Sequence, residues 1–159
     1  MHYIYKGMAA GLFAALAVAT LLLLNDQTGL LLELDFVSLI GSLTGIGAIG
    51  GWVLHFSLAA MMGGLFAWLD PDLPGDSLRQ RGMIFASLWW TLMVLFILPL
   101  GGLGVLGLGY GPLLPLALLA LHLVFGAVLG GTYGWLLLQS APLRYRHARA
   151  PAPTFRRTR

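Results

Sequence analysis

Residues 113–138 decide the fold, and they read LLPLALLALHLVFGAVLGGTYGWLLL. The stretch contains no Asp, Glu, Lys or Arg, and it is long enough to cross a bilayer, because a helix needs roughly 20 apolar residues to do so. Three further apolar stretches without these charged residues occur at residues 7–24, 47–69 and 82–98. The sequence therefore predicts an all-α membrane protein with four transmembrane helices.

The composition of the chain agrees with a membrane-embedded fold. Of the 159 residues, 58% are hydrophobic and 9% are charged, whereas an average soluble domain has about 25% charged residues. A soluble domain of this size could not bury so much apolar surface. The absence of cysteine excludes disulfides, iron–sulfur clusters and covalent attachment of c-type haem.

The basic residues predict the orientation in the membrane. Lys6 precedes the first span, Arg79 and Arg81 lie between the second and third, and six arginines follow the fourth. The loops on the other side contain no Lys or Arg. Since basic residues concentrate in cytoplasmic loops, both termini are expected to be cytoplasmic, with the protein in the bacterial inner membrane. The same distribution accounts for the net charge of +3 without nucleic acid as a partner.

Three segments lie outside the spans. Residues 30–43 alternate apolar and polar side chains and are predicted to form a short amphipathic helix at the outer interface. Residues 99–111 form an uncharged, glycine-rich loop that is expected to be flexible or to dip into the interface. Its G-x-G-x-x-G pattern lacks the strand–turn–helix context of a dinucleotide site. Residues 141–159 are expected to be a disordered, basic cytoplasmic tail that rests on anionic lipid or only fixes the topology.

The spans contain an internal repeat of a helical hairpin, at residues 6–70 and 81–138. The first helices of the two copies open with Lys6-Gly7-Met8 and Arg81-Gly82-Met83. The second helices match at constant spacing, with these pairs: His55 and His122, Gly63-Gly64 and Gly130-Gly131, Phe66 and Tyr133, and Trp68 and Trp135. Both copies begin and end on the same side, which predicts a pseudo-two-fold axis along the membrane normal. The expected product is a four-helix bundle over residues 1–140.

Three segments resemble an uncharacterised family of small bacterial four-helix integral membrane proteins. They are residues 51–56 (GWVLHF), 73–75 (LPG) and 121–130 (LHLVFGAVLG), and the resemblance extends over residues 6–135. It implies the four-helix topology. It implies nothing about chemistry, because the family has no settled activity.

The paired histidines, His55 and His122, are the candidate functional residues. Ionisable residues inside a membrane are rare and often functional, and imidazole is a common ligand of haem iron. Two histidines at one depth on repeat-related helices can meet across the axis as the axial ligands of one b-type haem. The alternatives are a shared metal ion, a chlorin or other tetrapyrrole, two separate sites, proton handling, or a structural pair that hydrogen-bonds to neighbouring helices.

A ridge of small residues follows each histidine at intervals of four: Ala59, Gly63 and Ala67 in the first copy, and Gly126, Gly130 and Gly134 in the second. Small residues permit close approach of another helix or of a flat macrocycle. Gly63, Gly126 and Gly130 are therefore candidate cofactor-binding residues. In one alternative each ridge packs on the first or third helix, which has small residues such as Gly7 and Gly11. In another, the second and fourth helices are close at the glycine end and open at the histidine end.

No catalytic constellation is visible, since no span contains a carboxylate and no nucleophile–base pair occurs. The first hypothesis is a small membrane subunit that binds haem b for electron transfer within a larger respiratory or photosynthetic complex. The second is a purely structural accessory subunit, and the third is a small channel or transporter. The expected partners are the lipid bilayer and other membrane subunits or a second copy of the chain, and no nucleic acid.

Overall fold

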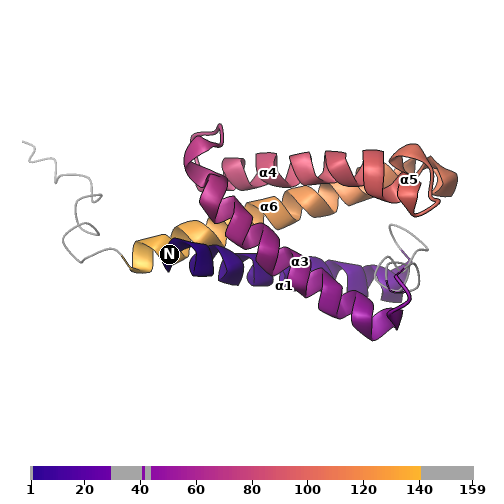
Figure 1. Cartoon of the computed structure of the whole chain (residues 1–159), viewed down its shortest axis with the longest axis horizontal. Helices are drawn as coiled ribbons and strands as arrows, with labels where there is room; N and C mark the ends of the chain where they lie inside the picture. The colour runs from indigo at the N-terminus through magenta and orange to yellow at the C-terminus, as the bar shows by residue number, and fades with distance from the viewer. Residues whose placement is uncertain (1, 30–40, 42–43, 141–159) are drawn as a thin grey trace, which may run out of the picture.

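The computed structural model describes residues 2–29, 41 and 44–140, and most of these residues are helical (Figure 1). The elements in chain order are α1 (His2–Thr28), α3 (Gly47–Leu69), the 3-10 turn η1 (Asp70–Asp72), α4 (Leu78–Leu92), the π-helical segment η2 (Met93–Ile97), α5 (Leu98–Leu100), the 3-10 segment η3 (Val105–Tyr110) and α6 (Leu113–Gln139). No strand occurs in these ranges. The interfacial helix predicted at 30–43, apart from Gly41, and the tail at 141–159 lie outside them.

Four helical spans are long and apolar enough to cross a membrane: His2–Thr28, Gly47–Asp72, Leu78–Leu100 and Leu113–Gln139. The prediction of an all-α fold with four such helices is therefore confirmed. The third span begins before residue 82, where the apolar stretch starts, because Ser77 and Gln80 form a capping box. The Ser77 hydroxyl accepts from the Gln80 N–H, and the Gln80 side chain accepts from the Ser77 N–H.

The helices form two pairs, α1 with α3 and α4 with α6, and the contact between α1 and α6 joins them (Figure 1). The beginning of α1 and the end of α6 lie at one end of the bundle, where the Lys6 ammonium donates to the Ser140 hydroxyl. We call this the terminal end. Near it the fully buried ring of Phe66 packs on Phe85 and Tyr133, with ring centroids 5.6 Å apart in each case. All four long helices contribute to this core.

At the opposite end, α4 and α6 form a second core with the connection between them. Its buried residues are Val94, Leu98, Leu103, Leu114 and Leu118. The glycine-rich loop, which is expected to be flexible or to dip into the interface, buries Leu103 and Gly107 at this end, and Gly107 has a φ of 71°. A side chain on Gly107 would meet Leu98 and Leu114, so the loop can close over the helix ends only with glycine at this position.

The π-helical segment Met93–Ile97 is an irregularity that the sequence analysis missed. It lies immediately before Leu98, whose N–H donates to the carbonyl of Met93, five residues earlier. Pro99 has no N–H, and a proline ring displaces the carbonyl four residues before it. A wider turn at this point accommodates the proline without ending the helix.

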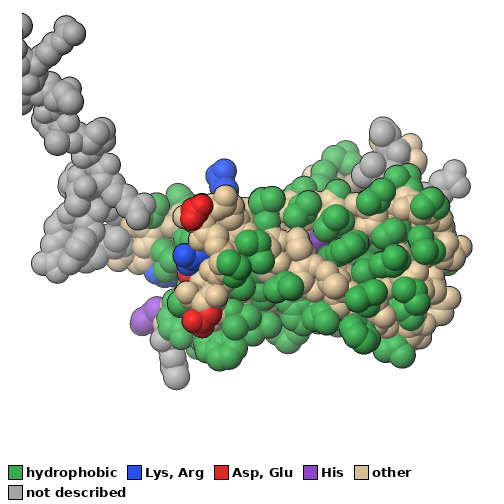
Figure 2. Space-filling model, turned by 90° about the horizontal axis from the view of Figure 1, so that it is seen from above, with side chains coloured by type: hydrophobic (Ala, Val, Ile, Leu, Met, Phe, Trp, Pro, Cys, Tyr) green, Lys and Arg blue, Asp and Glu red, His purple; other side chains and the backbone are tan. Residues whose placement is uncertain are grey.

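The polarity of the molecule agrees with a membrane-embedded protein. Among the described residues, no polar or charged side chain is buried, and large apolar side chains are exposed on every long helix. Figure 2 shows a face that is mostly hydrophobic, with the Lys, Arg, Asp and Glu side chains gathered toward one end. The apolar exterior matches a hydrocarbon environment, and the charged end matches a membrane–water boundary.

Candidate functional site

The small-residue ridge of α3 lies directly against α1. A Cβ added at Gly63 would meet the carbonyl oxygen of Gly7, and one added at Gly11 would meet the carbonyl oxygen of Ala59. The two backbones therefore touch, as in close helix pairs in membranes. This contact occupies the Gly63 surface that the sequence analysis proposed for a cofactor.

The ridge of α6 lies against α4 in the same way. A Cβ at Gly126 would meet the carbonyl oxygen of Gly82, and one at Gly130 would meet that of Leu78. Gly126 and Gly130 are both buried in this contact. The arrangement agrees with the alternative in which each ridge packs on the first or third helix.

His55 is bound within the first hairpin. Its Nε2 lies 3.4 Å from the carbonyl oxygen of Ala15 on α1. Since a carbonyl can only accept, the imidazole N–H is the donor, in a long interhelical hydrogen bond. The ring is half-buried and packs edge-on against Trp52 and Phe56, with centroid distances of 5.8 and 5.3 Å.

His122 is bound within its own helix. Its Nδ1 donates to the carbonyl oxygen of Leu118 at 2.7 Å, one turn earlier on α6. The ring is half-buried, and with Nδ1 as the donor, Nε2 is the ring nitrogen that can act as an acceptor. Across the described ranges, no hydrogen bond or ring contact joins the imidazoles of His55 and His122.

A metal site built from several side-chain ligands does not occur in the part of the chain that the structure describes. No group of three or more His, Cys, Asp or Glu side chains there could hold a metal ion. A haem iron needs only two axial ligands from the protein, so the prediction for His55 and His122 does not depend on such a group.

The terminal end contains two arginines with different surroundings. Arg81 is tied to the loop after α3: its guanidinium pairs with the Asp70 carboxylate at 3.2 Å and also donates to the carbonyls of Asp70 and Gly75. Arg79 is exposed and forms no hydrogen bond or ion pair with any described residue. Its side chain lies beside Gly131, where an added Cβ would be 3.2 Å from the Arg79 Nε.

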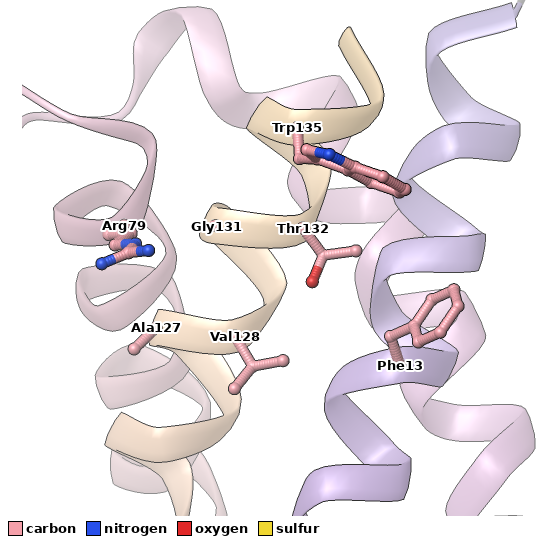
Figure 3. Close-up of a pocket in the computed structure, with 7 residues that line it drawn as sticks. All are labelled: Phe13, Arg79, Ala127, Val128, Gly131, Thr132 and Trp135. Atoms are coloured by element: carbon pink, nitrogen blue, oxygen red, sulfur yellow. The ribbon is translucent and has the colours of Figure 1, made fainter. Parts of the chain in front are cut away.

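A groove of about 570 Å³ runs along α6 beside Arg79 (Figure 3). Its lining residues are Phe13 of α1, Arg79 of α4, and Ala127, Val128, Gly131, Thr132 and Trp135 of α6. Figure 3 shows Arg79 on one side of α6 and Phe13 on the other, with Gly131 between them. From the sequence, Arg79 was assigned to the topology and to a charged loop, and no groove was predicted beside it. The internal repeat offered a signal for Arg79. With the spacing that pairs Lys6 with Arg81, Arg79 is paired with the apolar Ile4, so the arginine has no basic counterpart in the first copy.

Comparison with known proteins assigns a family without a function. A family model described as "Family of unknown function (DUF6789)" matches residues 1–143. This agrees with the resemblance to an uncharacterised family. No curated protein and no solved structure matches the chain.

Proposed function

The chain belongs to this family of unknown function, and we propose from its own geometry that it is a small structural subunit of the bacterial inner membrane. The arrangement of the two hairpins carries the proposal. The glycine ridges are in contact with neighbouring helices, and His55 donates to a carbonyl of α1. Apart from His122, which bonds within its own helix, the residues that attracted a cofactor hypothesis thus contribute to helix packing, as polar and small residues do in membrane bundles.

The charge distribution supports an orientation with both termini in the cytoplasm. Lys6, Arg79 and Arg81 lie at the terminal end, and the described residues at the opposite end include Asp26 and no Lys or Arg. This is the asymmetry that sets topology in bacterial membranes. The exposed apolar faces suit contact with lipid, with other membrane subunits or with a second copy of the chain.

Haem binding is the second candidate, and the geometry of His122 favours it. Histidines that ligate a metal commonly donate the other ring N–H to a carbonyl, and His122 donates Nδ1–H to Leu118. His55 would provide the second ligand of one b-type haem, which would supply one-electron transfer. Against this, the Nε2 of His55 faces the Ala15 carbonyl.

An absorption spectrum of the purified protein separates the two candidates. We expect a folded, monodisperse protein that stays colourless after expression with excess haem precursor. The haem candidate instead requires a Soret band that disappears in His55→Phe and in His122→Phe. His2→Phe is the matched control, because His2 is exposed at the start of α1 and belongs to neither hairpin interface.

Native electrophoresis of mildly solubilised membranes tests the subunit role. We expect the protein to migrate with a larger assembly, and the free monomer to appear only in harsher detergent. A stoichiometric haem in the wild-type protein, or migration as a monomer in the mildest detergent, would contradict the structural proposal.

A further inference from the structure

We propose that the groove along α6 holds one anionic phospholipid, with the phosphate at Arg79 and an acyl chain along the apolar part of the groove. This inference concerns a surface that the proposed structural role does not use. The groove lies beside the terminal end and is lined by residues of α1, α4 and α6 (Figure 3).

The position of Arg79 is the first argument. Gly131 has no side chain, so the aliphatic part of Arg79 can lie beside α6 at this point, with its Nε and Cγ 3.2 and 3.7 Å from where a Cβ would be. The guanidinium has no acidic partner among the described residues, whereas Arg81 is neutralised by Asp70. A planar guanidinium with free donors is the side chain best suited to bind a phosphate.

The rest of the lining matches the remaining parts of a lipid. Trp135 is 55% exposed and, like many interfacial tryptophans, has an indole N–H that can donate to ester or glycerol oxygens. The Thr132 hydroxyl is a further donor on the same side of α6 as Phe13 (Figure 3). Val128 and the 54% exposed Phe13 offer an apolar surface for an acyl chain.

A comparison within the chain is the second argument. The first hairpin has a groove of about 500 Å³ at the corresponding place, lined by Ile4, Met8, Ser57, Ala60, Met61, Gly64, Leu65 and Trp68. The repeat pairs Gly64 with Gly131 and Trp68 with Trp135, so the glycine and the tryptophan are present in both. It pairs Ile4 with Arg79 and Leu65 with Thr132. The first groove has a hydroxyl in Ser57 but no cation, so of these two grooves the one in the second hairpin has the cation that a phosphate headgroup requires.

Native mass spectrometry of the full chain in detergent, titrated with phosphatidylglycerol or phosphatidylcholine, tests the proposal. We expect the wild type to retain one phosphatidylglycerol in preference to phosphatidylcholine. Arg79→Gln should weaken phosphatidylglycerol binding about fivefold, the effect of one basic residue near an anionic surface, and leave phosphatidylcholine binding unchanged. Lys6→Gln is the matched control, because it removes the same charge at the same end from a separate groove.

Equal phosphatidylglycerol binding by the wild type and Arg79→Gln would overturn the proposal, and so would equal losses in Arg79→Gln and Lys6→Gln. Displacement of the lipid by millimolar inorganic phosphate would show a site for free phosphate and would also overturn it. Thermal melting in phosphatidylcholine micelles should be the same for the wild type and Arg79→Gln, which excludes unfolding as the cause of lost binding. A haem spectrum from the purified protein would contradict the proposed structural role, but it would not change the lipid-binding results.

Discussion

The two helical hairpins have the same interface and different surfaces. In both, a glycine of the first helix contacts a small-residue ridge of the second: Gly11 on Ala59 and Gly63, and Gly82 on Gly126. Outside this contact the pairs differ. One histidine bonds across to the neighbouring helix and the other bonds within its own helix, and a lone arginine occurs beside only one of the two grooves.

The features that the hairpins share serve helix packing, whereas the features in which they differ are candidates for binding a specific partner. Backbone contact between helices tolerates no side chain, so both copies need small residues at the same positions. A lipid-facing groove has no such steric constraint, and its side chains can diverge. The parts that the copies share therefore explain the bundle, and the parts in which they differ are where a specific partner is to be sought.

The largest expected loss of stability is for substitutions in the helix contact that both hairpins share. Gly63→Ala and its repeat equivalent Gly130→Ala place a Cβ against a backbone carbonyl of the neighbouring helix, and the helices must separate. We expect each to lower the free energy of unfolding by about 3 kcal/mol, measured by steric trapping in micelles.

The adjacent glycines are the matched controls for this prediction. In Gly64→Ala and Gly131→Ala the new Cβ lies 3.2 Å from the flexible side chains of Met8 and Arg79, respectively. These side chains can move, and alanine favours the helix by about 1 kcal/mol, so both variants should be neutral or more stable. Equal effects at the adjacent positions would refute the proposed geometry of the helix contact.

Substitutions of Arg79 and Arg81 should differ by a smaller amount in their effect on stability. Arg81→Gln removes the pair with Asp70 and the hydrogen bond to the Gly75 carbonyl, and we expect a loss of about 1 kcal/mol, because the pair is partly exposed to solvent. Arg79→Gln should leave the free energy of unfolding unchanged. Thermal melts of both variants in zwitterionic detergent provide the measurement, and a larger loss at Arg79 would show that it supports the fold.

Substitutions of His55 and His122 should show the smallest difference in stability. His55→Phe removes the long interhelical bond to Ala15 and is expected to cost about 0.6 kcal/mol, the average for such bonds in membrane bundles. His122→Phe removes a bond within one helix, so it should change the association of α6 with α4 even less. Steric trapping of both variants gives the comparison, and the reverse order would assign the interhelical role to His122.

Sequence reasoning predicted the four spans because the thickness of a bilayer imposes a length and a composition that local sequence must meet. The spans at 47–69 and 113–138 agree with α3 and α6 within one residue. The π-helical turn before Pro99 and the burial of Gly107 were not predicted, because both depend on contacts between segments. The candidate histidines and glycines were found by their spacing, which places them on helix faces without naming the neighbouring helix.

By itself, the sequence determined that the chain is a bundle of four apolar helices with two small-residue ridges, since hydropathy and helical periodicity are local properties. Only the tertiary structure decided what each ridge touches, which carbonyl each histidine reaches, and that Arg81 has an acidic partner whereas Arg79 lies beside an open groove. The physical reason is that a side chain's partner depends on which distant segments converge around it.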